Sequence, residues 1–176
     1  MNKFFFLVIL CCLQLSAQAQ KLQGGFKADI NGGYAIPTEG FGVKPGVMFT
    51  VEPHYYVTDN FVAGVRLEGA LLGYQAQSDD ELFSFFGSSI LTGDFYLSKS
   101  NVKPFIGMGA GLYTRHYIFE DYTGESLYTS GYGAIKLGFM GRAGFEIGHI
   151  RLTGSYNVVA ANFSYAAFTI GYVIRE

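Results

Sequence analysis

The chain has 176 residues and a formal net charge of −2, with 15% charged and 17% aromatic residues. This length suits a single domain with a sizeable core, and the weakly acidic balance excludes the basic surface of a nucleic-acid-binding protein. The composition is apolar, yet no apolar run beyond the N-terminal segment is long enough for a transmembrane helix. A membrane protein without such helices must be a closed β-barrel, because only closure pairs every backbone group in lipid.

Residues 1–19 are predicted to be a secretory signal peptide. Lys3 supplies the positive start, residues 4–13 the apolar stretch, and residues 17–19 (Ala-Gln-Ala) the small-residue cleavage site. The apolar stretch is about half of the ~20 residues that span a bilayer, which argues against an uncleaved anchor. Cleavage after Ala19 leaves residues 20–176 as the mature domain. Both cysteines lie in the signal, so the mature domain has neither disulfides nor thiolate metal sites.

Eight segments of the mature domain alternate apolar and polar residues, as β-strands do when their two faces differ. They cover residues 25–36, 47–57, 61–72, 85–97, 103–115, 135–147, 150–158 and 162–174. Each is close to the ~10 residues of a tilted membrane strand. We expect short turns at 58–60, 98–101 and 148–149, and the longest loop at about 116–131. Pro53 should weaken its strand or introduce a bulge, because proline cannot donate to the ladder.

The segment 135–148, IKLGFMGRAGFEIG, has one apolar face and one face of charges and glycines. Glycine in a strand interior packs nothing, so a water-facing glycine face is disfavoured. We therefore expect the apolar face to meet lipid and the polar face to line a narrow interior where glycines make room. A soluble periplasmic barrel with the faces inverted is the alternative. The residues predicted to face lipid are Ile135, Leu137, Phe139, Phe145, Ile147, Phe168, Ile170 and Tyr172.

The opposite faces of the strands supply a set of charges that should meet inside the barrel. The predicted interior charge network consists of Lys27, Asp29, Glu52, Arg66, Glu68, Asp94, Arg115, Lys136, Arg142, Glu146 and Arg151. Its cations and anions are nearly balanced, as a narrow interior without bulk water requires. An eight-stranded barrel is just wide enough for its side chains to fill, so this network should plug the interior.

The signal peptide, the eight segments, KPFIGMGAGLY at 103–113 and FTIGYVI at 168–174 resemble the small outer-membrane β-barrels of the OmpA and OmpX kind, the outer membrane protein beta-barrel domain group. The resemblance implies an all-β, closed, antiparallel transmembrane barrel of about eight strands with up-and-down topology, in the outer membrane of a Gram-negative bacterium. It implies outer-membrane lipid, lipopolysaccharide and the barrel-assembly machinery as partners, and no peptidoglycan-binding domain after the barrel.

Some sequence features could indicate a catalytic or ligand-binding site, but each has a simpler interpretation. The glycines 107, 109 and 111 keep strand period, whereas a phosphate loop needs a strand before and a helix after, so interior packing is favoured. His116 with the acids and Ser126 of the long loop could suggest a lipid-modifying enzyme, but a catalytic set is recognised by geometry. The acidic runs 79–81 and 120–121 lack the spacing of a calcium loop. His54 and His149 lack a paired ligand at metal spacing, so we predict no metal and no cofactor.

These observations predict a non-enzymatic outer-membrane barrel whose role is structural or depends on surface interactions of its extracellular loops. A narrow porin-like channel for small solutes is the first alternative, and a lipid-modifying enzyme is the second.

Overall fold

The computed structural model describes residues 25–39, 43–75, 81–120, 127–130, 135–160 and 163–175. The predicted signal peptide lies outside them. The described residues form strands β1 (Phe26–Pro37), β2 (Val43–Tyr56), β3 (Phe61–Gln75), β4 (Glu81–Tyr96), β5 (Val102–Glu120), β6 (Leu127–Ser130), β7 (Lys136–Ile147), β8 (Ile150–Val159) and β9 (Tyr165–Arg175). Among these residues no helix is long and apolar enough to cross a membrane.

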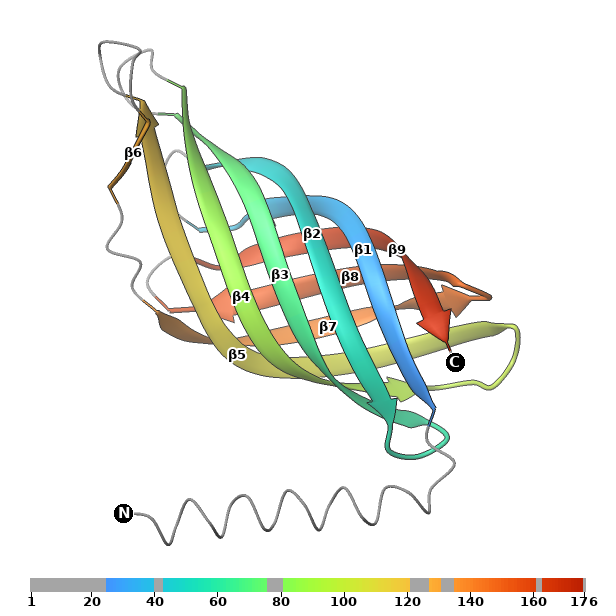
Figure 1. Ribbon diagram of the computed structural model, residues 1–176. Coiled ribbons are helices and arrows are strands. Elements are labelled where there is room, and N and C mark those ends of the chain that lie inside the picture. The colour runs from blue at the N-terminus through green and yellow to red at the C-terminus, as the bar shows by residue number, and fades with distance from the viewer. Residues whose placement is uncertain are drawn as a thin grey trace, which may run out of the picture.

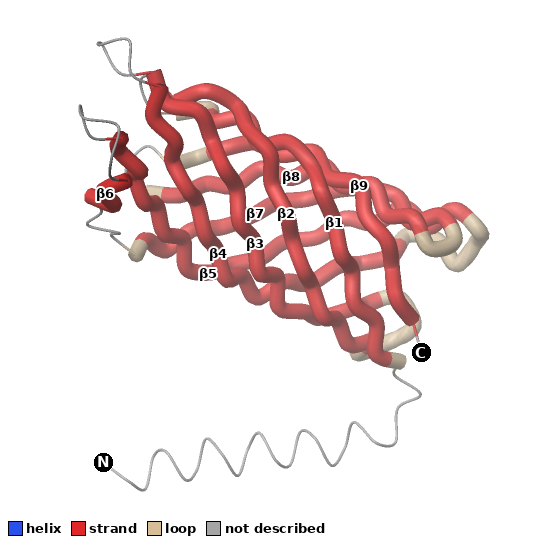
Figure 2. Tube along the Cα trace, turned by 45° about the horizontal axis from the view of Figure 1, so that its top comes forward, coloured by secondary structure: helices blue, strands red, loops and turns tan. Residues whose placement is uncertain are grey.

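Eight strands close into an antiparallel barrel (Figures 1 and 2). Each strand pairs with its neighbour in the chain, except that β5 pairs with both β6 and β7. The ladder between β1 and β9, which includes the pair Lys27 and Arg175, closes the circle. The small β6 pairs with the tip of β5. The predicted closed, up-and-down barrel of about eight strands is therefore confirmed.

The predicted short turns occur where expected, between β2 and β3, β4 and β5, and β7 and β8. The last is a two-residue connection in which Gly148 has φ of 59°, a conformation that costs little only in glycine. Because the barrel is up-and-down, these turns share one end with the start of β1 and the end of β9. We call this the short-turn end, and the opposite one the long-loop end.

The loop predicted at about 116–131 is partly wrong. Strand β5 continues to Glu120, and residues 117–120 pair with residues 127–130 of β6. The sequence explains the error, because Tyr117 to Phe119 and Leu127 to Thr129 are aromatic, β-branched or apolar residues that favour strands. Residues 121–126 and 131–134 of the predicted loop lie outside the described residues.

Pro53 has less effect than expected. The register between β2 and β3 is the same on both sides of it, since Val51 pairs with Leu67 and His54 with Gly64. The irregularity lies instead between Lys44 and Gly46, around Pro45. A proline inside a ladder is tolerated at such a bulge, so the strand bends near the long-loop end and stays regular in the middle of the barrel.

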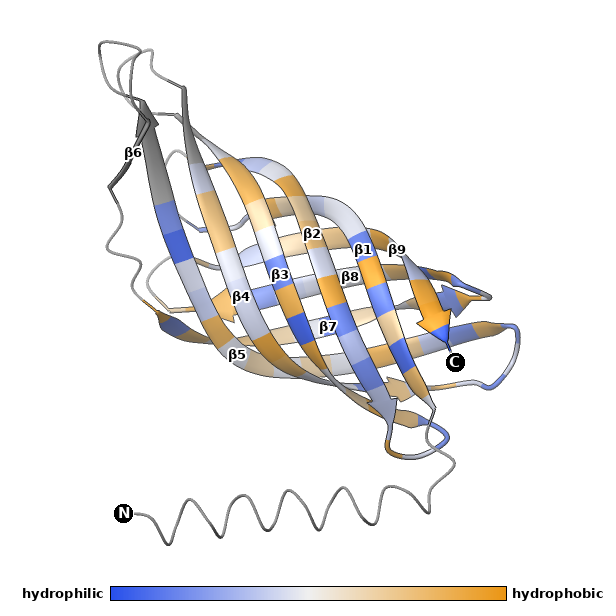
Figure 3. Cartoon of the chain, viewed as in Figure 1, coloured by the Kyte–Doolittle hydropathy of each residue, from blue (hydrophilic) through white to orange (hydrophobic). Residues whose placement is uncertain are grey.

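The two faces of the barrel differ as the sequence pattern predicts. Hydropathy varies along the coloured parts of the barrel strands, with apolar and polar residues interspersed (Figure 3), and the outer surface carries large apolar side chains on all eight barrel strands. All eight residues predicted to face lipid point outward and are between 48% and 73% exposed. Such a continuous apolar exterior is far larger than the patches that soluble monomers expose.

The interior has three layers. At the long-loop end an apolar layer contains Met48, Leu72, Phe86, Ile90, Tyr113, Met140 and Tyr165 with smaller residues. At the short-turn end a smaller apolar layer contains Val62, Tyr96 and Phe105, with Tyr56 packed against it. Charged side chains occupy the space between them and extend past the smaller layer to the short-turn rim, where Glu146 and Arg175 lie.

Candidate functional site: the ionic core

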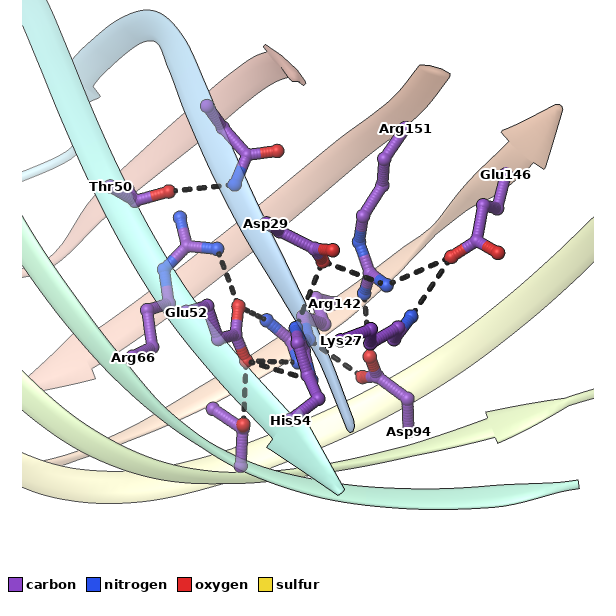
Figure 4. A network of polar contacts seen from close by, with 12 residues as sticks. Lys27, Asp29, Thr50, Glu52, His54, Arg66, Asp94, Arg142, Glu146 and Arg151 are labelled. Atoms are coloured by element: carbon purple, nitrogen blue, oxygen red, sulfur yellow. Dashed lines mark hydrogen bonds and ion pairs between the residues drawn. The ribbon is translucent and has the colours of Figure 1, made fainter. Parts of the chain in front are cut away.

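The charged layer is a continuous network inside the barrel (Figure 4). We call it the ionic core, and its charged members are Lys27, Asp29, Glu52, Arg66, Glu68, Asp94, Arg142, Glu146, Arg151 and Arg175. They come from β1, β2, β3, β4, β7, β8 and β9. Strand alternation brings them together, because every second residue of each strand faces the interior.

Arg142 lies at the centre of the ionic core. Its two terminal nitrogens donate to the two carboxylate oxygens of Glu52, both at 2.6 Å, and its Nε donates to Asp94 at 2.7 Å. Thr92 also donates to Glu52, at 2.6 Å. The bidentate pairing is the strongest geometry for a guanidinium and a carboxylate. It joins β7 to β2 and β4, neither of which is its neighbour in the sheet.

Arg151 connects the centre to the short-turn end. Its Nη2 donates to Asp94 at 2.5 Å, its Nη1 donates to the Tyr96 hydroxyl at 2.9 Å, and its guanidinium lies 3.9 Å above the centre of the Phe105 ring. The short-turn apolar layer thus covers the cation directly.

Lys27 and Glu146 complete this part of the network. The ammonium of Lys27 lies 2.9 Å from Glu146 and donates to the hydroxyl of Tyr96 at 2.5 Å, and that hydroxyl donates to Glu146 at 2.7 Å. Arg175, whose side chain is 31% exposed, also binds Glu146. These residues close the ring of charges near the rim.

Arg66 connects the centre to the long-loop end. Its Nε donates to Glu68 at 2.8 Å, and its Nη1 lies 3.5 Å from Glu52. Glu68 also accepts a hydrogen bond from the hydroxyl of Tyr165, whose ring packs against Phe86 in the long-loop apolar layer. The aromatic layers at both ends are therefore hydrogen-bonded to the charges that they cover.

His54, Asp29 and Glu52 form the described group closest to a metal-ligand arrangement. His54 Nε2 lies 2.9 Å from Asp29, and its Nδ1 lies 3.9 Å from Glu52. Arg151 approaches the same Asp29 oxygen to 3.3 Å, and Arg142 occupies both oxygens of Glu52. Guanidinium groups thus already contact Glu52 and one oxygen of Asp29, while Asp29 Oδ1 and His54 Nδ1 have no hydrogen-bond partner among the described residues.

The ionic core is electrically balanced. Its five carboxylates face the side chains of one lysine and four arginines, namely Lys27, Arg66, Arg142, Arg151 and Arg175. Burying a charge is costly unless it is paired and hydrogen-bonded, and each of these charges has an opposite charge within 4 Å. The arrangement fills this part of the interior with paired charges.

Ten of the eleven predicted network residues are at most 8% exposed inside the barrel. Lys136 differs: it is half-buried at the start of β7, and no ion pair joins it to another described residue. Arg115 lies inside the barrel, next to the long-loop apolar layer. It donates to Ser84 at 2.9 Å and lies over the rings of Phe86 and Phe163.

Sequence reasoning missed the aromatic and peripheral members of the network. Tyr96, Tyr165 and Arg175 are not among the predicted members, and for His54 the sequence predicts only that it lacks a paired metal ligand. Parity could have indicated Tyr96, which follows Asp94 by two residues on β4, and Arg175 extends the inward parity of β9 by one step. Nothing in the sequence pairs His54 with Asp29, because their distance depends on register.

The other features singled out in the sequence do not form a site among the described residues. Glycines 107, 109 and 111 lie within β5, and a Cβ on Gly107 would meet Asp94 Oδ1 at 2.0 Å, so the glycine makes room for the network. His116 lies on β5 opposite Phe85. Ser126, Asp121 and Glu125 of the predicted long loop lie outside the described residues, as do the acids at 79–80.

No family model and no curated protein matches the sequence, but solved structures match the fold. OprG from Pseudomonas aeruginosa gives a TM-score of 0.57 at 11% identity, covering 86% of this chain and 96% of OprG. Ail, the attachment invasion locus protein of Yersinia pestis, in complex with the heparin analogue sucrose octasulfate, gives 0.55 at 12% identity, covering 87% of this chain and all of the other. The chain therefore has the fold of the small eight-stranded outer-membrane β-barrels.

Proposed function

We propose that this protein is a non-enzymatic β-barrel of the bacterial outer membrane, exported by a cleaved signal peptide. It acts as a structural element or through surface interactions of its long-loop end. The observation that carries the proposal is the combination of a continuous apolar exterior with an interior that is filled by the ionic core and two apolar layers. A closed barrel with these two faces matches the requirements of lipid outside and packed side chains inside.

The filled interior argues against the alternative of a porin-like channel. A conduit needs a polar path from end to end, whereas Phe105 and Tyr96 cover the ionic core on one side and Tyr165 on the other. Planar-bilayer recordings of the refolded protein test this directly. We expect no stable conductance steps, and reproducible steps that scale with salt concentration would favour the channel.

The membrane location and the cleavage of the signal peptide are tested separately. The protein should stay in carbonate-washed outer-membrane fractions, and mass spectrometry of the isolated form should show a chain that begins at Gln20. Recovery in the soluble periplasmic fraction would contradict the membrane assignment. A retained and acylated Cys12 would contradict the signal cleavage while leaving the barrel intact.

The surface role is tested on intact cells. Crosslinking through the long-loop end, followed by affinity capture of the barrel, should recover a cell-surface partner. The lipid-modifying alternative predicts instead that lipid A changes mass when the gene is deleted, and we expect no such change.

A further inference from the structure

The outer surface of the barrel contains a groove of about 750 Å³ that crosses β1, β9, β8, β7 and β5. Around the barrel the residues Tyr34, Phe168, Gly154, Ala143 and Ile106 follow one another as direct register partners. The small residues Gly154 and Ala143 therefore lie between the large side chains of Phe168 and Ile106. This order makes a trough with an aromatic wall on one side and an aliphatic wall on the other.

The groove continues toward the short-turn end. The neighbouring row of outward residues that lines it includes Leu152, Phe145 and Pro104, and Leu97 at the end of β4 lines it as well. Leu97 and Pro104 flank the short turn between β4 and β5. The groove therefore reaches from the apolar exterior to the rim at the short-turn end, which in an outer-membrane barrel faces the periplasm.

The rim beside the groove carries an exposed cation. Lys99 follows the groove residue Leu97 by two positions. The side chain of Lys99 is 65% exposed, and its partner Asp59, 2.7 Å away, is 85% exposed. An ion pair this exposed contributes little stability, so Lys99 can exchange Asp59 for another anion at small cost.

We propose that this groove binds one phospholipid of the periplasmic leaflet, with an acyl chain along Gly154 and Ala143 and its phosphate near Lys99. The inference rests on the proposed membrane location and names a lipid ligand for the exterior. An apolar trough inside the lipid-facing surface that ends near the exposed Lys99 complements an amphipathic anion with a hydrocarbon tail. The large side chains on either side of the groove hold the chain in one position.

The test is native mass spectrometry of the barrel released from vesicles that contain phosphatidylglycerol and phosphatidylethanolamine. We expect one retained phospholipid per wild-type barrel. Ala143→Leu fills the trough and should lower retention by about tenfold or more. Ala110→Leu is the matched control, because Ala110 also faces outward, on β5, but does not line the groove. It should leave retention unchanged.

Two further measurements complete the test. Lys99→Gln should lower the retention of phosphatidylglycerol while the barrel stays folded. The gel-mobility shift of folded barrels monitors folding of each variant, and Ala143→Val is the smaller substitution if Ala143→Leu does not fold.

Three outcomes would overturn the inference. Equal retention in wild type, Ala143→Leu and Ala110→Leu would mean ordinary surface lipid. A lipid-free dimer abolished by Ala143→Leu would assign the groove to a second copy of the chain. Retention of lipopolysaccharide in place of phospholipid, when both are supplied, would place the groove in the other leaflet. Failure of the wild type to enter vesicles would instead overturn the proposed function itself.

Discussion

At the scale of single residues, Arg142 decides whether the interior is assembled. It holds Glu52 with two hydrogen bonds and Asp94 with a third, and all three side chains are buried. The sequence places Arg142 in the same interior network as these acids but does not identify which of them it contacts. Glu52 comes within reach of Arg142 because β2 and β7 face each other across the interior.

Arg142→Leu should destabilise the folded barrel by about 3–5 kcal/mol, because it leaves two buried carboxylates without their main cation. The measurement is urea-dependent unfolding from lipid vesicles, followed by the gel-mobility shift. The double variant Arg142→Glu with Glu52→Arg reverses both charges and restores the ion pair between β7 and β2. It should recover part of the lost free energy of unfolding. A stabilising Arg142→Leu would mean that these charges do not face a dry interior.

Phe139 tests the opposite face of the same strand. It is 69% exposed on the exterior, between Ala110 and Val158 of the neighbouring strands. Phe139→Arg should cost roughly 2–4 kcal/mol if the residue lies near the bilayer midplane, with less cost near an interface. Phe139→Leu keeps the apolar contact and should be nearly neutral in the same unfolding assay. A harmless Phe139→Arg would show that this face meets water.

At the scale of strands, glycines distinguish the two faces. A Cβ on Gly107 of β5 would lie 2.0 Å from Asp94 Oδ1, whereas a Cβ on Gly141 of β7 would meet nothing within 4 Å. Gly107→Ala should therefore push Asp94 away from Arg142 and cost about 1–3 kcal/mol, the usual range for overpacking. Gly141→Ala is the matched control and should change the unfolding midpoint little. Equal effects of the two substitutions would contradict the interior role of Gly107.

The strands and their faces could be predicted because alternation is a local property. Lys27 and Asp29, for example, share a face whatever β1 pairs with. The pairing of charges could not be predicted in the same way. Arg142 reaches Glu52 only because eight strands close with a particular register, and a shift of two residues would keep every face while changing every partner.

The same reasoning explains why the loop prediction at about 116–131 was partly wrong. Residues 116–120 and 127–130 lack the clear alternation of barrel strands, and their pairing depends on a hairpin at the tip of β5. A hairpin of this kind is stabilised by cross-strand neighbours that the sequence does not identify. Pro45 and Pro53 give a similar example: both prolines are visible in the sequence, but only the register shows that the bulge lies at the first.

At the scale of the whole molecule, the three interior layers depend on one another. The apolar layers keep water from the ion pairs, and the ion pairs hold together strands that are not neighbours in the sheet. Tyr96 and Tyr165 belong to both systems, since each has a ring in an apolar layer and a hydroxyl bonded to a carboxylate. The barrel should therefore respond to salt as a protein with buried ion pairs does.

Salt screens exposed charge pairs strongly and buried pairs much less. The urea midpoint of the wild-type barrel in vesicles should consequently change little between low and high potassium chloride. Phe105→Ala removes the ring that lies 3.9 Å from the Arg151 guanidinium, opens the short-turn layer to water and should make the midpoint fall as salt rises. Phe145→Ala removes the same side chain from the exterior one strand away, and its midpoint should stay independent of salt. If the wild type were as salt-sensitive as Phe105→Ala, water and ions would already reach the ionic core, and the interior would be a conduit.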